Sequence, residues 1–286
     1  MLERAYTLDD ITVIIVTYNS AHCIELFAAD LTEFAHVIVS DNASEDETQD
    51  AVRRNIPHAR LLQHARNLGY GAANNRALEQ VTTRFAFLLN PDCQISTAAA
   101  LGMLAVFTDY PQAAAVAPQL LRSNGGAEIN YRWPGTLWSS RGGGADAICS
   151  VGFVCAAAVM LKMPLAQNVG GFDEDFFLYY EDEDLCLRLF KAQQNILVAP
   201  HIHLTHASRG SVRGNHPLQA EFGRGYHHAQ SKILFAKKHI GQHHASKLRY
   251  KTLALALLSF PLRLLIPLPK YVARHAGRVA GLLSLR

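Results

Sequence analysis

The stretch ITVIIVTYNS, residues 11–20, decides the fold of this chain. It is an unbroken run of apolar, mostly β-branched residues that stops at the polar residues Tyr18, Asn19 and Ser20. A strand that is buried on both faces of a parallel sheet has this continuous apolar pattern, whereas a half-exposed strand alternates. The stretch therefore predicts a buried parallel strand that ends in a loop.

Two later apolar runs, HVIVSDNAS (36–44) and FAFLL (85–89), also end in polar residues. The elements expected between these strands are helices at 21–33 and 46–55 and a short strand at 60–63. Strands that alternate with helices predict an α/β fold with a doubly wound sheet. Ligands bind such sheets at the carboxyl ends of the strands, where the strand order reverses. The residues expected to converge there are Thr17, Tyr18, Asp41, Asn90 and Asp92.

Composition narrows the class of protein. A chain of 286 residues, 49% of them hydrophobic, can bury the core of one large domain or slightly more. The net charge of +3 is mild and does not indicate a nucleic-acid partner. Five cysteines without a CxxC pair favour reduced thiols in the cytosol over disulfides or a zinc site. The N-terminal residues MLERAYTLDD lack the pattern of a signal peptide.

Two short motifs are compatible with phosphate and metal chemistry. In RNLGYGAANN (66–75), small residues would let a helix N-terminus approach a diphosphate, although a simple helix-start turn explains them equally well. Asn90-Pro91-Asp92 offers a strand-end carboxylate to a divalent cation, and the alternative is an Asx turn. The presence of Asp41 at the neighbouring strand end favours the metal interpretation.

A carboxylate cluster stands in the stretch GFDEDFFLYYEDEDLCLRLFKAQQN, residues 171–195. The four acids at 181–184 follow a group of aromatic residues and precede an amphipathic helical run. Acids in a first helical turn complement the helix dipole, and Asp184 can pair with Arg188 one turn later. An acid beside Tyr179 and Tyr180 would instead be partly desolvated, which raises its pKa and suits a general base.

Taken together, VIIVTYNS, VIVSDNASEDET, RNLGYGAANN, FLLNPD and GGFDEDFFLYYEDEDLCLR resemble the successive motifs of inverting family 2 glycosyltransferases with the GT-A fold. The resemblance covers about residues 10–210 and is greatest to a bacterial rhamnosyltransferase-like branch. It implies a Rossmann-like mixed sheet and a Mg²⁺ or Mn²⁺ cofactor.

The resemblance also implies roles for individual residues. Asp182 matches the catalytic base, and the metal ligands are Asp92 and His206, with Asn90 in place of the first acid of a DxD motif. The residues expected beside the nucleotide are Thr17, Tyr18, Asp41, Asn67, Gly69, Asn74 and Asn90. The residues expected to contact the acceptor are Trp133, Tyr179, Tyr180 and Glu181.

The chain is expected to divide near residue 215. Residues 1–215 would form the GT-A domain, with a nucleotide-sugar half at 10–120 and an acceptor and catalytic half at 121–215. Residues 216–286 would form a helical, basic-amphipathic extension in which His227, His228, His243 and His244 are solvated. Its apolar run 252–269 contains Arg263 and is expected to be broken by Pro261, Pro267 and Pro269, which favours an anchor on anionic lipid over a spanning helix. A helical cap or a dimer contact is the alternative.

These inferences converge on an inverting transferase. It would move a sugar, L-rhamnose from dTDP-L-rhamnose as best guess, from a dTDP or UDP donor to a hydroxyl of a glycan or polyprenyl-diphosphate-linked acceptor. Its expected location is cytoplasmic, peripheral at the inner face of the membrane, with no nucleic-acid partner. The rival hypothesis is a catalytically weak nucleotide-sugar-binding or scaffolding subunit of a polysaccharide-assembly complex, since Asn90 replaces a metal-binding acid.

Overall fold

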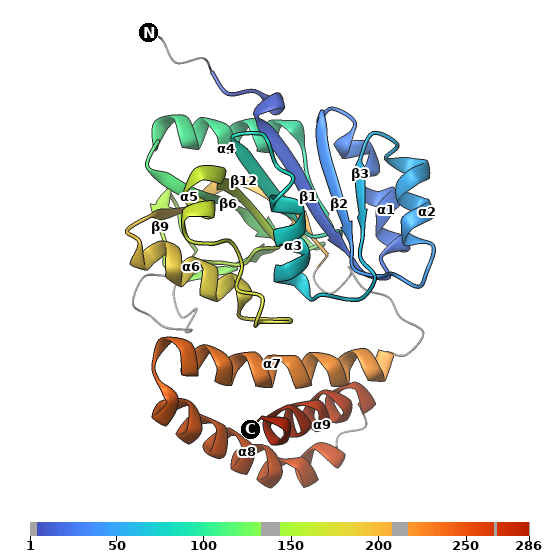
Figure 1. Ribbon diagram of the computed structural model, residues 1–286, viewed down its shortest axis with the longest axis vertical. Helices are drawn as coiled ribbons and strands as arrows, with labels where there is room; N and C mark the ends of the chain where they lie inside the picture. Colours follow the sequence, from blue (N-terminus) through green and yellow to red (C-terminus); the bar gives the residue numbers. More distant parts are fainter. Residues whose placement is uncertain (1–4, 133–143, 208–216, 266–267, 286) are drawn as a thin grey trace.

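A computed structural model describes residues 5–132, 144–207, 217–265 and 268–285 (Figure 1). Ten strands form one sheet: β1 (Ile11–Thr17), β2 (His36–Asp41), β3 (Arg60–Gln63), β4 (Phe85–Leu89), β5 (Cys93–Gln94), β6 (Ala113–Leu121), β7 (Ala127–Glu128), β9 (Cys149–Ser150), β11 (Ala158–Lys162) and β12 (Asn195–His206). A small second sheet pairs β8 (Tyr131–Arg132) with β10 (Phe153–Val154). The helices are α1 (Ala21–Ala28), α2 (Thr48–Asn55), α3 (Tyr70–Leu78), α4 (Thr97–Asp109), α5 (Met163–Asn168), α6 (Glu181–Lys191), α7 (Pro217–His239), α8 (Gln242–Leu264) and α9 (Pro269–Ser284).

The large sheet is mixed, with the strand order β3-β2-β1-β4-β11-β6-β12-β5. Strands β3, β2, β1 and β4 are parallel, β11 is antiparallel to both of its neighbours, and β12 is parallel to β6. The chain moves from β1 outward to β2 and later returns to pair β4 on the other side of β1. Thr17 and Asp41 are directly paired at the carboxyl edge, as the strand-end pattern predicted.

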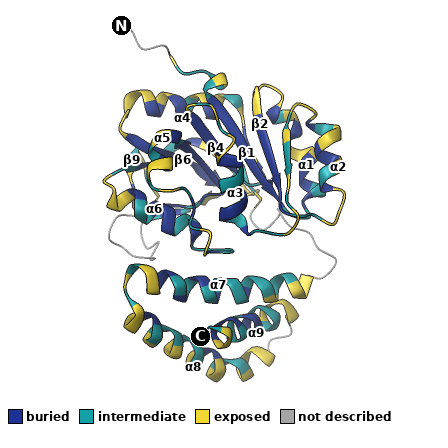
Figure 2. Ribbon diagram, in the orientation of Figure 1, coloured by how far each residue is buried: buried dark blue, intermediate teal, exposed yellow. Residues whose placement is uncertain are grey.

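Helices cover both faces of this sheet (Figure 2). On one face, α1, α2 and α4 bury residues such as Phe27, Val52 and Phe107 against the odd-numbered side of β1. On the other face, α3, α5 and α6 contribute a second cluster that includes Ala77 and Leu189. Because β1 is covered on both sides, all seven of its residues are buried, which explains its continuous apolar sequence. The expected doubly wound α/β fold is confirmed.

One expected strand is interrupted. The sequence VGFVCAAAVMLK (151–162) reads as a single buried strand, but the structure divides it into β10 and β11. The residues between them, Cys155 to Ala157, belong to neither strand. Ala156 N–H donates to Asp182, and the Ala157 carbonyl accepts from Asn90 N–H. The interruption therefore places these peptide groups at the carboxyl edge of the sheet, in contact with Asp182 and Asn90.

The C-terminal helices α7, α8 and α9 form a separate layer beside the sheet domain (Figure 1). Helices α7 and α9 cross closely because glycines stand at the contact: a Cβ on Gly225 would lie 1.9 Å from the Arg274 carbonyl oxygen. Pro261 lies inside α8 without ending it, so the expected break at this proline is wrong. Among the described residues, the helices all fall short of the length and apolar character needed to span a bilayer.

Candidate active site

The carboxyl ends of β1 and β2 are joined through the Asp41 side chain, which is fully buried. Its oxygens accept from the Thr17 hydroxyl at 3.0 Å, from the Ser44 backbone N–H at 3.0 Å, from the Ser44 hydroxyl at 2.5 Å and from Gln49 Nε2 at 2.8 Å. A nucleobase N–H could reach this carboxylate only by replacing one of those donors. Gln49 is the most replaceable of them, because it comes from α2 and not from the strand ends or the turn that follows β2. Tyr18, expected to line the base, is half-buried beside this pair.

The Gly-rich loop packs against the acidic segment, and hydrogen bonds fix the conformation of the loop itself. Gly69 precedes α3 with φ +89°, and its carbonyl accepts from Asn42 Nδ2 at 3.0 Å. Asn67 Oδ1 accepts from Gly69 N–H at 2.9 Å and so shapes the turn. Asn74 is buried and donates to the Tyr70 carbonyl at 3.0 Å within α3. Of the three residues of this loop that were expected beside the nucleotide, Asn67 and Gly69 thus belong to the turn itself and Asn74 faces the protein interior.

The two expected metal ligands lie together. Asp92 Oδ1 is 3.5 Å from His206 Nε2, where β5 pairs with the end of β12. The other imidazole nitrogen, Nδ1, lies 3.2 Å from Glu128 Oε2 on β7. Burial lowers the pKa of His206, but its contacts with Asp92 and Glu128 outweigh burial and raise it. A carboxylate on Nδ1 fixes the ring so that Nε2 points to Asp92.

The donor chemistry of this cluster fits a divalent cation. Asp92, His206 and Cys93 place one potential ligand atom each within 4.8 Å of one another. The Cys93 thiol donates to the Ala157 carbonyl, and burial raises its pKa well above the ordinary value, so it stays neutral. The cluster then offers one carboxylate oxygen and one imidazole nitrogen. Carboxylate oxygen and imidazole nitrogen are both ligands that divalent cations accept in proteins.

The acidic helix α6 begins in strained backbone. Tyr179 and Tyr180 both have positive φ, +68° and +69°, a conformation that costs an L-residue about 1–2 kcal/mol. This turn brings Asp182 beside Ala156, whose N–H donates to Asp182 Oδ2 at 3.4 Å. Burial raises the pKa of Asp182 above its usual value, although backbone hydrogen bonds oppose that rise. A raised pKa suits a group that must accept a proton near neutral pH.

The other three acids of the cluster differ in environment. Glu181 is only 5% exposed, and its Oε2 has no hydrogen-bond partner among the described residues. Burial, followed by the charge of Asp182, raises the pKa of Glu181 well above the ordinary value. Glu183 pairs with Arg132 at 2.8 Å, and burial raises its pKa to about 8. Glu181 and Glu183 therefore do not face open solvent: both stand in the first turn of α6 with their side chains directed inward.

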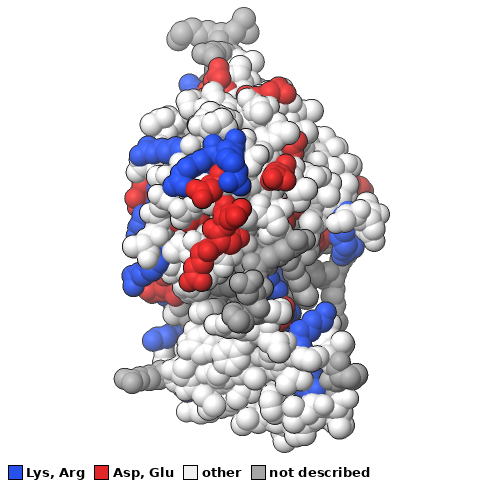
Figure 3. Space-filling view, turned by 90° about the vertical axis from the view of Figure 1, so that its right-hand side faces the viewer, with Lys and Arg blue, Asp and Glu red and all other residues white. Residues whose placement is uncertain are grey.

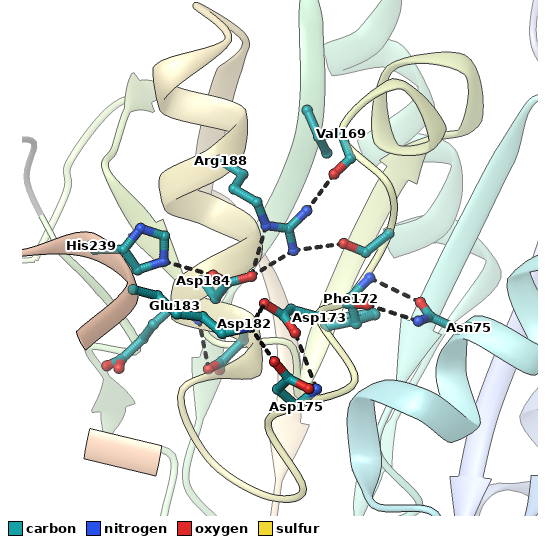
Figure 4. Close-up of polar contacts among 12 residues, drawn as sticks. Asn75, Val169, Phe172, Asp173, Asp175, Asp182, Glu183, Asp184, Arg188 and His239 are labelled. Atoms are coloured by element: carbon teal, nitrogen blue, oxygen red, sulfur yellow. Dashed lines mark hydrogen bonds and ion pairs between the residues drawn. The ribbon is translucent and has the colours of Figure 1, made fainter. Parts of the chain in front are cut away.

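Asp184 is structural, as its spacing to Arg188 predicted. Arg188 Nε donates to Asp184 Oδ2 at 2.7 Å, and its other nitrogens donate to the carbonyls of Val169 and Gly171 (Figure 4). His239 Nε2, from the end of α7, lies 2.7 Å from Asp184 Oδ1. This buried carboxylate therefore ties α6 to both the preceding loop and the C-terminal helices.

Helix α7 supports the aromatic residues before α6. The His227 ring lies 4.4 Å from the Phe177 ring, and the His228 ring lies 5.5 Å from those of both Tyr179 and Tyr180. Burial lowers the pKa of His228 to about 4, so the ring is neutral. The expectation that these two histidines are solvated is wrong, because the apolar loop covers them. Tyr179 and Tyr180 are consequently only half-exposed.

The segment Cys155–Ala157 lies between the two halves of the site. On one side, Ala156 N–H contacts the Asp182 carboxylate. On the other side, the Ala157 carbonyl accepts from Asn90 N–H at 2.8 Å and from the Cys93 thiol at 3.4 Å. One short loop thus fixes the candidate base relative to the candidate metal ligands.

Sequence reasoning missed Glu128 and Gln49. Glu128 stands in an irregular Gly-rich region, and only its pairing between β6 and β7 brings it to His206. Gln49 lies one helical turn beyond Asp46, with no motif to single it out. Trp133, expected to contact the acceptor, lies outside the described residues.

Comparison with solved structures identifies the fold. The mannosyltransferase PcManGT from Pyrobaculum calidifontis, in complex with GDP-Man and Mn²⁺, superposes with a TM-score of 0.58 at 17% identity, covering 97% of this chain and 87% of that one. S. aureus TarS 1-349 in complex with UDP-GlcNAc gives 0.59 at 20% identity, covering 79% and 65%. The fold is that of the GT-A glycosyltransferases.

The chain belongs to glycosyl transferase family 2, whose model matches residues 12–167. A curated relative, the N-acetylglucosaminyl-diphospho-decaprenol L-rhamnosyltransferase of Mycobacterium tuberculosis, is 28% identical and covers 82% of this chain and 86% of its own length. The low-salt glycan biosynthesis hexosyltransferase Agl10 of Haloferax volcanii is 23% identical, with 87% and 82% covered. The family expected from the sequence motifs is confirmed.

Proposed function

We propose that this protein is an inverting glycosyltransferase that moves a sugar from a nucleoside diphosphate to a hydroxyl of a lipid-linked or growing glycan. The observation that carries the proposal is the bridge formed by Cys155–Ala157, which holds Asp182 on one side and the strand end with Asn90 and Cys93 on the other. An inverting transfer needs one base and one site for the leaving diphosphate, and Asp182 and the strand end before Asp92 lie on either side of this loop.

Asp182 is the proposed base. It removes the proton from the acceptor hydroxyl as the oxygen bonds to the anomeric carbon, while the bond from that carbon to the diphosphate oxygen breaks. Burial raises the pKa of Asp182, which favours its acceptance of this proton. Asp92 and His206 would hold Mn²⁺ or Mg²⁺. When bound, that cation stabilises the negative charge of the leaving diphosphate.

The proposed donor is dTDP-L-rhamnose and the proposed acceptor a polyprenyl-diphosphate-linked sugar, at the inner face of the cytoplasmic membrane. The L-rhamnosyl group and the diphosphate-linked acceptor are supported by the mycobacterial relative, an N-acetylglucosaminyl-diphospho-decaprenol L-rhamnosyltransferase. A screen of dTDP- and UDP-sugars by mass spectrometry, with a polyprenyl-diphosphate-sugar as acceptor, identifies the transferred sugar.

The variant Asp182→Asn tests the assignment of the base. We expect it to lower the transfer rate by about 10²–10⁴-fold with dTDP binding unchanged. Asp175→Asn is the matched control, because Asp175 lies in the same acidic segment but its side chain is 69% exposed and pairs with Lys238. Full transfer activity in Asp182→Asn would show that the base is another group, and absent transfer in the wild type with every donor would favour the scaffolding hypothesis.

A further inference from the structure

An exposed row of leucines runs along the outer side of α8. Leu255, Leu258, Leu262 and Leu265 are 57%, 76%, 65% and 80% exposed. Their spacing of three, four and three residues places them on one face of a helix that turns every 3.6 residues. Apolar side chains gathered on one surface in this way indicate an interaction site, whereas single exposed leucines do not. We call these four residues the leucine face.

The neighbouring surface adds to the apolar area. Leu257 and Leu264 on α8 are 52% and 59% exposed, and Leu268 and Tyr271 at the start of α9 are also exposed. Only two α8 residues, Ala245 and Ala256, are buried. The helix packs on α7 and α9 through these alanines and the half-buried Leu248, Leu253 and Phe260, and leaves its other large apolar side chains outside.

Charge around the leucine face has a single sign. The last acidic residue of the chain is Glu221, and residues 222–286 contain twelve Lys and Arg. Lys247, Lys251, Arg263 and Lys270 are exposed on or beside α8. In Figure 3 the acids gather on the sheet domain, and the part formed by the C-terminal helices is mostly uncharged, with Lys and Arg as its main charged groups.

We propose that the leucine face and its flanking Lys and Arg residues bind the surface of a bilayer that contains anionic lipid. In this arrangement α8 lies in the interface plane, its leucines reach the acyl boundary and its cations contact the headgroups. A second copy of the chain fits less well, because a two-fold contact through α8 would oppose Lys and Arg with Lys and Arg. A helix on the surface also agrees with the absence of a bilayer-spanning helix among the described residues.

The candidate active site lies on the side of the sheet domain that faces the C-terminal helices. The carboxyl edge of the sheet faces the layer of C-terminal helices (Figure 1), and Ser231 on α7 donates to the Leu178 carbonyl at 2.9 Å. The aromatic residues before Asp182 therefore lie on the side of the molecule that α8 would bring to the membrane. This orientation matters for catalysis only if the acceptor is linked to lipid, so this step rests on the proposed function.

Vesicle flotation of the full chain tests the surface without donor or acceptor. We expect co-flotation with phosphatidylcholine vesicles containing phosphatidylglycerol, less with phosphatidylcholine alone, and a decrease as salt is raised. The double variant Leu258→Glu/Leu262→Glu should bind roughly tenfold or more weakly, since it places two carboxylates at the headgroups. Leu26→Glu is the matched control, because Leu26 is 62% exposed on α1, in the sheet domain, and should leave flotation unchanged.

Two results would overturn the proposal. One is equal flotation of the double variant and the wild type, with circular dichroism showing both folded. The other is a dimer in light scattering that the double variant dissociates, combined with no vesicle binding by the wild type, which would assign the leucine face to a second copy. Transfer to a water-soluble acceptor is measured separately, so that failure of the glycosyltransferase assignment and failure of the membrane assignment remain distinguishable.

Discussion

Gly69 lies so close to Phe177 that a Cβ atom on Gly69 would sit 2.2 Å from the Phe177 carbonyl oxygen. That oxygen accepts from Tyr70 N–H at 3.0 Å. Nearby, Asn75 Nδ2 donates to the Phe172 carbonyl and Asn75 Oδ1 accepts from Phe172 N–H (Figure 4). The loop that begins α3 and the segment that leads to Asp182 are thus joined by backbone contacts, and only glycine fits between them.

Substitution of Gly69 by alanine should disturb both parts of the candidate site. We expect Gly69→Ala to lose about 1–3 kcal/mol of unfolding free energy and to reduce transfer, because φ +89° is unfavourable for alanine and its Cβ would displace the 177 peptide. Gly170→Ala separates the two causes, since Gly170 has φ +84° and open space around its Cβ position. Urea unfolding and transfer assays measure both. If the two variants behave alike, the contact with Phe177 is unimportant.

Glu128 should affect metal binding without contacting the metal. We expect Glu128→Gln to weaken Mn²⁺ binding by about 10–100-fold, since the carboxylate orients the His206 ring through Nδ1. Titration followed by Mn²⁺ electron paramagnetic resonance measures the affinity without the transfer reaction. Glu79→Gln, which alters an exposed pair with Arg76, is the control. Unchanged Mn²⁺ affinity in Glu128→Gln would mean that His206 needs no orienting partner.

The acidic turn of α6 should make stability depend on pH. The pKa of Glu183 is raised from 4.5 to about 8, so the folded protein holds this proton over a range in which the unfolded chain has released it. Stability is therefore expected to be greatest below about pH 4.5, as far as this group is concerned, and to fall as pH rises toward 8. Glu183→Gln should flatten that dependence in melting curves between pH 5 and about 8. An identical slope in the variant would assign the dependence to other groups.

Local sequence patterns were sufficient to predict which residues lie at the carboxyl edge of the sheet, but not which residues surround them. Thr17, Asp41 and Asp92 follow buried strands, and parallel strands bring their ends together by geometry alone. Glu128 reaches His206 only through pairing of β7 with β6, which no short pattern contains. The interruption at Cys155–Ala157 likewise depends on partners far along the chain, because the residues themselves are as apolar as a strand.

The C-terminal helices illustrate the same limit. His227 and His228 stand in a basic stretch that reads as solvated, yet the rings pack on Phe177, Tyr179 and Tyr180. That contact depends on how α7 lies against the loop before α6. By contrast, His243 and His244 are exposed in the structure, as their polar sequence surroundings predicted.

His239 should contribute to the attachment of α7 to α6. Its side chain is 11% exposed, and its loss would leave Oδ1 of the buried Asp184 without this donor, while Arg188 still holds Oδ2. We expect His239→Ala to destabilise the protein by about 1–3 kcal/mol, the cost of a buried polar group that loses its partner. His243→Ala, at an exposed position four residues later, should change the unfolding free energy by less than about 0.5 kcal/mol. Urea unfolding compares the two variants. Equal stabilities would mean that water replaces His239 at no cost and that the other contacts of α7, such as those of Ser231 and Lys238, hold it in place.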